Sequence, residues 1–430
     1  MKKIMKKMYA VVLVMALLAT LIGCANSGSG EEGGTEENPT LVCWHILNPE
    51  SDADPRNTAL KEIVDEWNAN NEYGATMEVV SVTWEDIGSQ LTQAAAAGNS
   101  PDVVCAFSAY LDQYIAAGAL QPMTEYATEW IGENPEYIFS ADSITKEDGE
   151  IYSLPWETRV MTMYYRSDIF GEELPYNSLE DIVDVAAEYS GNGTYGYLFG
   201  FYADSDFLQQ LTPILYAFGG GVYDENMNII INTEEGKGVE AIEWLRDLYN
   251  AGVLDDAALQ MNFEDVFDAM KAGQAYSIVL GTHRYGALTS TEDIGQYIKT
   301  AAIPGAQGGT AAAYDTSQTL GIGADCEYPE IAFDFIAANC TTEASAKYYD
   351  ASCMPVRTDV YDLESVQQSE MYDVMSQWSE TWETGFDNLI FEPDYNEELS
   401  IALAEAVQDM LVNGTDIQAG LDEVVARFQD

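Results

Sequence analysis

The chain has 430 residues and carries 73 acidic against 17 basic side chains, a formal net charge of −56. Hydrophobic residues make up 47% of it, which is typical of a globular protein and excludes a disordered one. So acidic a surface repels nucleic acid, and no nucleic-acid partner is expected, although the acidity could also reflect habitat alone. The length exceeds what one hydrophobic core usually holds and therefore predicts two domains.

The first 24 residues have the features of a secretory signal. Four lysines precede an apolar run over residues 11–22, which is too short to span a membrane as a helix. The run ends in LIGC, which resembles the lipobox of bacterial lipoproteins. The resemblance implies that residues 1–23 are a lipoprotein signal peptide and that Cys24 carries the lipids. The alternative is an ordinary signal peptide followed by an unrelated cysteine. Residues 24–40 are rich in Gly, Ser and Glu and should form a flexible linker.

Strands and helices alternate over residues 41–118. Apolar, β-rich runs predict strands over 41–47, 77–83 and 101–107, and helical spacing predicts helices over 58–69, 84–98 and 110–118. This order is typical of a parallel sheet with helices on both faces, in which ligands bind beyond the carboxyl ends of the strands. Those ends are Trp44–Asn48, Thr83–Trp84 and Phe107–Tyr110.

A second α/β block begins near residue 158. A strand running into a helix is expected over 161–170, helices over 178–191, 206–221, 233–252 and 263–273, strands over 195–202 and 274–281, and a hairpin over 222–232. In the helix over 233–252, Thr233 should be the N-cap and Gly252 the C-cap. From Glu327 onward the chain is expected to be mainly helical.

Five cysteines follow Cys24, an odd number that cannot be fully paired and that lacks the spacing of a metal site. They are expected to be small buried hydrophobic residues. No metal site, other cofactor or catalytic motif is expected, and the glycine run at 219–221 lacks the context of a phosphate loop.

Several passages, in this order, resemble the extracellular solute-binding proteins of ABC importers, specifically the large sugar-binding, maltose-binding-protein-like family. They are WHIL at 44–47, AAAAGNSPDVV at 94–104, GALQPM at 118–123, GEIYSLPWET at 149–158, MYYRSDIF at 163–170, the stretch 218–253 from FGGGVY to YNAGV, FDAMKAGQAYSIVLG at 267–281 and MPVR at 354–357.

The resemblance implies an α/β, two-lobe periplasmic-binding-protein-like fold, each lobe a sheet flanked by helices, with the ligand in a cleft between the lobes. Lobe one would hold 41–155 and 280–325, and lobe two 156–279 and 326–430. The chain would cross near Tyr152–Arg159, Gly273–Gly281 and Gly321–Glu330.

The function implied is that of a monomeric substrate-binding subunit, not an enzyme. It would be lipid-anchored on the extracellular face of the cytoplasmic membrane, capture an oligosaccharide and deliver it to ABC permease subunits. Alternatives are the same role for a polyamine, a peptide or glycerol phosphate, and a surface-anchored glycan hydrolase.

A sugar site needs aromatic plates and planar side chains that form paired hydrogen bonds. Trp44, Trp84 and Trp156 fall at strand ends or in the expected hinge, but each could instead pack in a core. Arginine offers a rigid donor fork, and an ordinary salt bridge is the alternative for Arg159 and Arg357 and the preferred interpretation of Arg56. The candidate ligand-binding residues are Trp44, His45, Trp84, Glu85, Ser108, Tyr110, Trp156, Glu157, Arg159, Gly220, His283, Arg284, Tyr314, Asp315, Arg357, Trp378 and Trp382.

Overall fold

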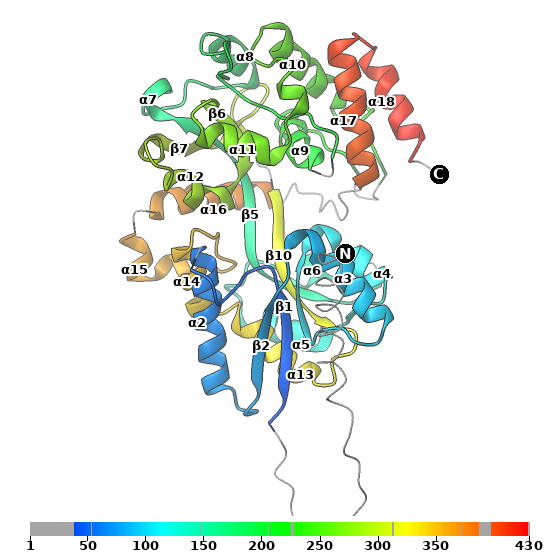
Figure 1. The fold of residues 1–430 in the computed structure, drawn as a ribbon, viewed down its shortest axis with the longest axis vertical. Coiled ribbons are helices and arrows are strands. Elements are labelled where there is room, and N and C mark those ends of the chain that lie inside the picture. Colours follow the sequence, from blue (N-terminus) through cyan, green and yellow to red (C-terminus); the bar gives the residue numbers. More distant parts are fainter. Residues whose placement is uncertain are drawn as a thin grey trace, which may run out of the picture. The chain divides into compact units, whose positions relative to one another are not determined.

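A computed structural model describes residues 38–52, 54–146, 148–204, 206–224, 228–311, 314–369, 371–386 and 397–428 (Figure 1). Side chains at 85, 109, 310, 314–316 and 380–386 lie outside this description. The chain from Pro39 onward forms one compact unit. The predicted signal peptide, Cys24 and the linker up to residue 37 are not among the described residues. None of the described helices is long and apolar enough to cross a membrane.

Within the described residues, eight strands are joined in the order β2-β1-β3-β10-β5-β6, with β4 on β10 and β7 on β5. β1 pairs in parallel with β2 and β3, whereas β10 and β5 pair antiparallel with their neighbours. A two-stranded ladder of β8 and β9 lies apart. The strands are β1 (Thr40–His45), β2 (Thr76–Ser81), β3 (Val103–Phe107), β4 (Leu120–Gln121), β5 (Ser153–Arg166), β6 (Ser277–Gly281), β7 (Ile298–Ala301), β8 (Ile303–Pro304), β9 (Thr310–Ala311) and β10 (Tyr314–Gly323).

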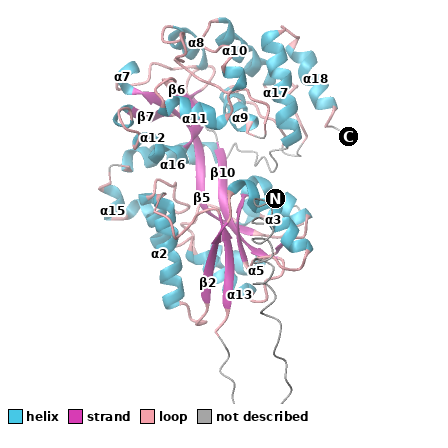
Figure 2. Ribbon diagram, viewed as in Figure 1, coloured by secondary structure: helices cyan, strands magenta, loops and turns pink. Residues whose placement is uncertain are grey.

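The 14-residue strand β5 connects two hydrophobic cores. Its residues from Ser153 to Val160 pair with β10, and those from Met161 to Arg166 pair with β6 and β7 (Figure 2). β10 runs beside β5 in the opposite direction, with irregular register between Tyr314 and Thr319. β5 includes most of the range 152–159, where a crossing is expected, and β10 runs back beside it. β6, in the range 273–281, pairs only with the second half of β5.

The two cores collect different parts of the chain. The first core takes buried side chains from 41–160 and 320–378, with a smaller cluster on the other face of its sheet. The second core takes side chains from 161–311 and 399–425, together with Phe107. Residues 298–311 thus pack in the second core and 329–378 in the first, which differs from the expected lobe ranges. Continuous β-rich runs placed the strands, but no local pattern told which core the later helices would join.

Three helices around the first core were predicted by residue range: α3 and α4 start within one residue of the expected position, and α2 starts three residues before it. Asp54 caps α2 by accepting a hydrogen bond from the Arg56 amide, and Pro55 occupies the first turn, where its missing N–H costs nothing. These helices are α2 (Pro55–Asn70), α3 (Trp84–Ala96), α4 (Leu111–Ala116), α5 (Thr124–Glu133), α6 (Ala141–Ile144), α13 (Pro329–Ala338), α14 (Thr342–Asp350), α15 (Glu364–Gln367) and α16 (Tyr372–Phe386).

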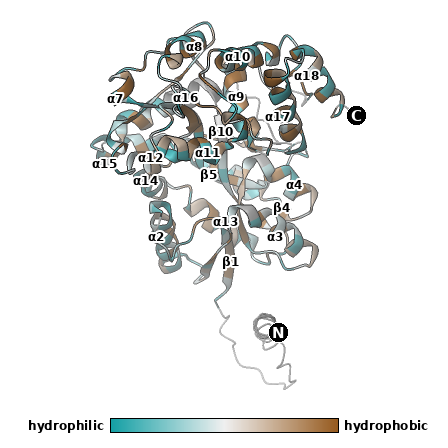
Figure 3. Ribbon diagram, turned by 45° about the horizontal axis from the view of Figure 1, so that its top comes forward, coloured by the Kyte–Doolittle hydropathy of each residue, from teal (hydrophilic) through white to brown (hydrophobic). Residues whose placement is uncertain are grey.

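Helices around the second core carry both hydrophilic and hydrophobic residues, as expected where one face packs and the other meets water (Figure 3). An Asn262–Asp265 capping box starts α11. The helices are α7 (Ser167–Phe170), α8 (Leu179–Ala187), α9 (Phe207–Ala217), α10 (Gly238–Asn250), α11 (Phe263–Lys271), α12 (Tyr285–Thr289), α17 (Glu397–Val412) and α18 (Ile417–Ala426).

In the second block, one predicted strand is wrong and one predicted helix starts later than expected. The strand expected over 195–202 makes only single bridges, from Tyr195 to Ala275 and from Leu198 to Ile278. The helix expected from Thr233 starts at Gly238, after a left-handed Lys237. A side chain at Gly238 would come within 2.2 Å of the Ile231 carbonyl oxygen, so only glycine fits at the start of this helix.

Candidate ligand-binding site

The parallel strands present their predicted carboxyl ends at one edge of the first sheet. β1 ends at His45, β2 at Ser81 and β3 at Phe107, and each is followed by a helix start. Trp44 is half-buried in β1, and Trp84 opens α3. Ser108 and Tyr110 lie in a 3₁₀ turn after β3. The alternating pattern of the sequence therefore placed these residues at the correct end of the sheet.

Trp84, Phe107 and Tyr110 form a cluster that we call the aromatic shelf. The Trp84 and Phe107 rings meet edge to face at 4.5 Å between centroids, and Tyr110 lies 6.1 Å from each ring. Trp84 remains 40% exposed and is the one tryptophan among the large apolar side chains found exposed in the described residues. An indole that is fixed by two rings and still open to water can receive the apolar face of a ligand.

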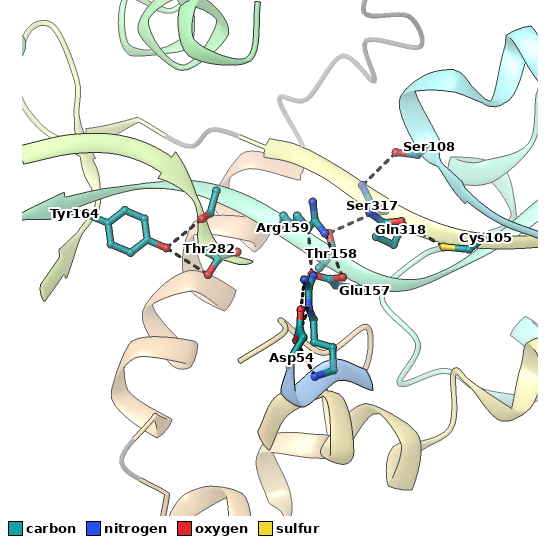
Figure 4. Close-up of polar contacts among 12 residues, drawn as sticks. Asp54, Cys105, Ser108, Glu157, Thr158, Arg159, Tyr164, Thr282, Ser317 and Gln318 are labelled. Carbon is teal, nitrogen blue, oxygen red and sulfur yellow. Dashed lines mark hydrogen bonds and ion pairs between the residues drawn. The ribbon is translucent and has the colours of Figure 1, made fainter. Parts of the chain in front are cut away.

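Four side chains of alternating charge lie near the shelf, and we call them the charge chain. Asp54 accepts three hydrogen bonds from the Arg56 guanidinium, at 2.6–3.1 Å, and Glu157 accepts two from Arg159, at 3.1 and 3.4 Å (Figure 4). Burial opposes the charge of Asp54, but the hydrogen bonds and charge of Arg56 outweigh it and hold the pKa of Asp54 below its usual value. The Arg159 guanidinium carbon lies 5.6 Å from the Phe107 ring centroid, so the charge chain meets the aromatic shelf.

Both histidines are neutral at neutral pH. His45 is fully buried, and its Nδ1 accepts a hydrogen bond of 3.0 Å from the Leu47 amide, which assigns the proton to Nε2. Burial, and then the charge of Arg56, lower the pKa of His45 to about 3. Burial and the charges of Arg159, Arg284 and Arg56 also lower the pKa of His283.

Hydroxyl contacts tie the strands together beside these residues. The Ser108 hydroxyl accepts a hydrogen bond of 3.1 Å from the Ser317 amide, and the Ser317 and Thr158 hydroxyls are 3.3 Å apart. The Tyr164 hydroxyl donates to the carbonyls of Gly281 and Thr282, at 3.0 and 3.3 Å, and so fastens the 3₁₀ turn Thr282–Arg284 to β5 (Figure 4). This turn follows β6 directly and carries His283 and Arg284.

Two of the candidate tryptophans are packed in the core. Trp156 is 1% exposed and lies between His45 and Tyr348, with ring centroids at 5.5 and 4.4 Å. Trp378 is also 1% exposed and meets Tyr285 edge to face at 5.4 Å. Both residues therefore pack in the core, which is the alternative to ligand binding. Of these candidates, Trp84 is the one with an exposed ring.

Arg357, Arg284 and Gly220 are held by other parts of the molecule. Arg357 donates to Asp359 at 2.7 and 2.9 Å and to Asn134 at 3.0 Å, so it forms the salt bridge that is the alternative to ligand binding. Arg284 pairs with Glu264 and lies over rings of α11. Gly220 fits a close backbone approach, since a Cβ there would lie 2.3 Å from the Gly236 carbonyl oxygen.

The sequence did not predict some residues near the site, and the side chains of four candidates lie outside the described part of the structure. Asp54, Thr158 and Ser317 were not singled out, although the two-residue spacing of Glu157 and Arg159 in a strand does predict that they share a face. Tyr314 and Asp315 lie in β10 and Glu85 and Trp382 in helices, but their side chains are outside the description. Among the described residues, no cluster of three or more His, Cys, Asp or Glu side chains is arranged to hold a metal ion.

Comparisons with known proteins agree with this architecture. The profile of a family described as bacterial extracellular solute-binding protein matches residues 62–372. A maltotriose-binding protein of Pyrococcus abyssi is 23% identical over 188 residues, which are 43% of this chain and 38% of that protein. The chain thus spans less than two fifths of the length of this curated relative.

Solved structures share the fold. The GacH receptor of Streptomyces glaucescens, solved without ligand and with acarbose, has a TM-score of 0.73 at 17% identity, covering 91% of this chain and 98% of its own. T. maritima MalE3 with bound maltose has a TM-score of 0.70 at 19% identity, covering 90% and 98%. These similarities confirm the predicted α/β, two-lobe fold class.

Proposed function

Because the chain belongs to the bacterial extracellular solute-binding proteins, we propose that it is the substrate-binding subunit of an ABC importer and that its solute is a carbohydrate, in particular an oligosaccharide. A maltotriose-binding relative and structural neighbours solved with acarbose and with maltose support the choice of solute. The observation that carries it is the aromatic shelf at the carboxyl ends of parallel strands, where an exposed indole packs on Phe107 and a guanidinium lies over that Phe107 ring.

In this proposal the sugar stacks on Trp84, and hydroxyl groups of the sugar accept hydrogen bonds from Arg159. Lobe one comprises 41–160 with 320–378, and lobe two 161–311 with 399–425, a division that the grouping of core side chains supports. β5 and β10 connect the lobes. A sugar that contacts both lobes favours their closed arrangement, which then docks on the permease.

We further propose that Cys24 is lipidated and holds a monomer on the extracellular face of the cytoplasmic membrane. The linker after Cys24 keeps the lobes at high local concentration beside the permease. The protein would bind its sugar without cleaving it, since binding and release serve transport.

A titration tests the proposal. Soluble protein starting at residue 25 is mixed with a panel of oligosaccharides, monosaccharides, polyols, polyamines and peptides while tryptophan fluorescence and melting temperature are recorded. A sugar present at 100 times its dissociation constant should stabilise the protein by about 2.7 kcal/mol. A response only to a solute that is not a carbohydrate would refute the sugar, and release of new reducing ends from a polysaccharide would refute the transporter role.

Two tryptophan variants locate the site. Trp84→Ala should abolish or strongly weaken binding of the sugar. Trp130→Ala is the matched control, because Trp130 is also on a helix and meets one ring, Tyr137, edge to face at 5.1 Å, but lies outside the aromatic shelf. Equal loss of affinity in both variants would contradict the placement.

A further inference from the structure

Four ion pairs among the described residues join side chains two positions apart, and one of them is unlike the rest. In three, the shortest contact is 2.6 or 2.7 Å and the carboxylate side chain is 26–33% exposed: Asp54–Arg56, Arg166–Asp168 and Arg357–Asp359. In the fourth, Glu157 is 1% exposed and its shortest contact to Arg159 is 3.1 Å. Glu157 thus presents almost no surface to solvent, and its contact with Arg159 is longer than the shortest contact of the other three pairs.

Glu157 serves two cations. Its carboxylate accepts hydrogen bonds from Arg159, and its negative charge also acts on Arg56. Burial would lower the pKa of Arg56, but its hydrogen bonds to Asp54 and the charges of Glu157 and other groups outweigh burial and raise it. Without the Glu157 charge, Arg56 would keep Asp54 as its partner, whereas Arg159 would lose the one carboxylate it bonds among the described residues.

Arg159 uses one edge of its guanidinium for this pair and leaves another edge available. Its Nε and Nη2 donate to Glu157, while Nη1 donates to no residue in the described part of the chain. The side chain keeps 7% of its surface exposed and lies over Phe107 of the aromatic shelf. A planar fork held along one edge is pre-organised to donate along the other, so less side-chain entropy is lost when a ligand binds.

We propose that Glu157 is a positioning residue: it does not touch the solute but holds Arg159 so that the Nη1 edge faces a sugar bound on the aromatic shelf. The inference rests on the proposed carbohydrate function. Glu157, a candidate for direct ligand contact by sequence, thus contacts Arg159 instead of the solute, as its burial and the geometry of the pair indicate.

The test is a double-mutant cycle measured by calorimetric titration with the sugar that the wild type binds most tightly. Glu157→Gln keeps the shape of the side chain but removes its charge, and should raise the dissociation constant about tenfold. Arg159→Gln should raise it at least as much. In the Arg159→Gln background, adding Glu157→Gln should change the constant less than twofold, because the residue acts only through Arg159.

Asp359→Asn is the matched control, since it breaks another pair of this spacing around an equally buried arginine. It should lower the melting temperature and leave sugar affinity within twofold. Should Glu157→Gln fail to fold, Glu157→Asp replaces it. That variant keeps the charge but withdraws the carboxylate by one methylene, and it too should weaken binding.

Each other result decides against the inference. Unchanged affinity in the Glu157 variant, with a lower melting temperature, would make Glu157 purely structural. Additive losses would mean that Glu157 acts independently of Arg159, and full affinity in Arg159→Gln would remove the contact it is said to position. Wild-type protein that binds no sugar would overturn the proposed function itself, and this inference with it.

Discussion

His45 should make the protein less stable as the pH falls below about 6.5. Its imidazole is fully buried and neutral, and burial with the nearby charge of Arg56 lowers its pKa to about 3, whereas an unfolded histidine titrates at 6.5. Between these values the unfolded chain binds a proton that the folded chain refuses. The folding stability that depends on a neutral His45 is fully present above pH 6.5 and is lost progressively as the pH falls toward 3.

The size of the effect follows from the two pKa values. At pH 5 the proton uptake of the unfolded state costs about 2 kcal/mol of folding stability, and at pH 7.5 it costs about 0.1 kcal/mol. His45→Asn removes the titration and keeps an acceptor for the Leu47 amide, which His45 Nδ1 now satisfies at 3.0 Å. The variant loses the ring that packs 5.5 Å from Trp156, so it should be less stable than the wild type at pH 7.5.

The difference in unfolding free energy between wild type and His45→Asn is measured by urea unfolding at pH 7.5, 6 and 5, followed by tryptophan fluorescence. The gap in unfolding free energy between wild type and variant should shrink by about 2 kcal/mol from pH 7.5 to pH 5. Titration of the many carboxylates affects both proteins alike and cancels in the difference. A gap that stays constant over this range would refute the assignment of a buried neutral imidazole.

Three further outcomes are expected. The five cysteines after Cys24 are buried and free, and burial raises the pKa of Cys105 to about 12, so a thiol reagent should react with native protein only as fast as the protein unfolds; prompt labelling of all five would contradict this. Gly323→Ala would place a Cβ 1.9 Å from the Pro101 carbonyl oxygen and should cost about 1–3 kcal/mol in thermal unfolding, whereas Gly132→Ala, with no atom within 4 Å, should stabilise helix α5 by up to about 1 kcal/mol; equal effects would argue against the close packing at β10. Trp378→Ala should destabilise the protein by about 3–5 kcal/mol in urea unfolding, as expected for a fully buried indole, and a loss below 1 kcal/mol would argue against its burial.

Local patterns predicted the part of the site that depends on strand ends. Alternation of strands and helices over 41–118 set the direction of the first sheet, and this alone put Trp84, Ser108 and Tyr110 at its carboxyl edge. The prediction that the five later cysteines are buried is confirmed. These features follow from residues close together in the chain.

Contacts between residues that are distant in the sequence were not predicted. Nothing near Trp156 in sequence reveals that His45 and Tyr348, more than 100 residues away on either side, enclose its ring. The same holds for the charge chain, which brings the helix cap Asp54 and its partner Arg56 near Glu157 of β5, about 100 residues later in the sequence. A tryptophan at a predicted hinge can be a plate or a core residue, and only tertiary packing decides between the two.

The assignment of later helices to a core also required the structure. The resemblance placed α13 and α14 in lobe two, yet their side chains belong to the first core and both helices lie against α2. β10 carries the chain back to the first core. Its polar segment from Tyr314 to Gln318, where the register is irregular, gives no clear strand signal in the sequence. Residues that bridge two cores face neither solvent nor one core alone, so ordinary alternation is absent.

The most direct measurement is a crystal structure of the soluble protein with the sugar that it binds most tightly. The account predicts one sugar ring lying on the Trp84 face, with its hydroxyl groups accepting hydrogen bonds from Arg159 and with no contact to the Glu157 carboxylate. A sugar bound elsewhere on the molecule, or one that reaches Glu157 directly while leaving Trp84 in water, would contradict it.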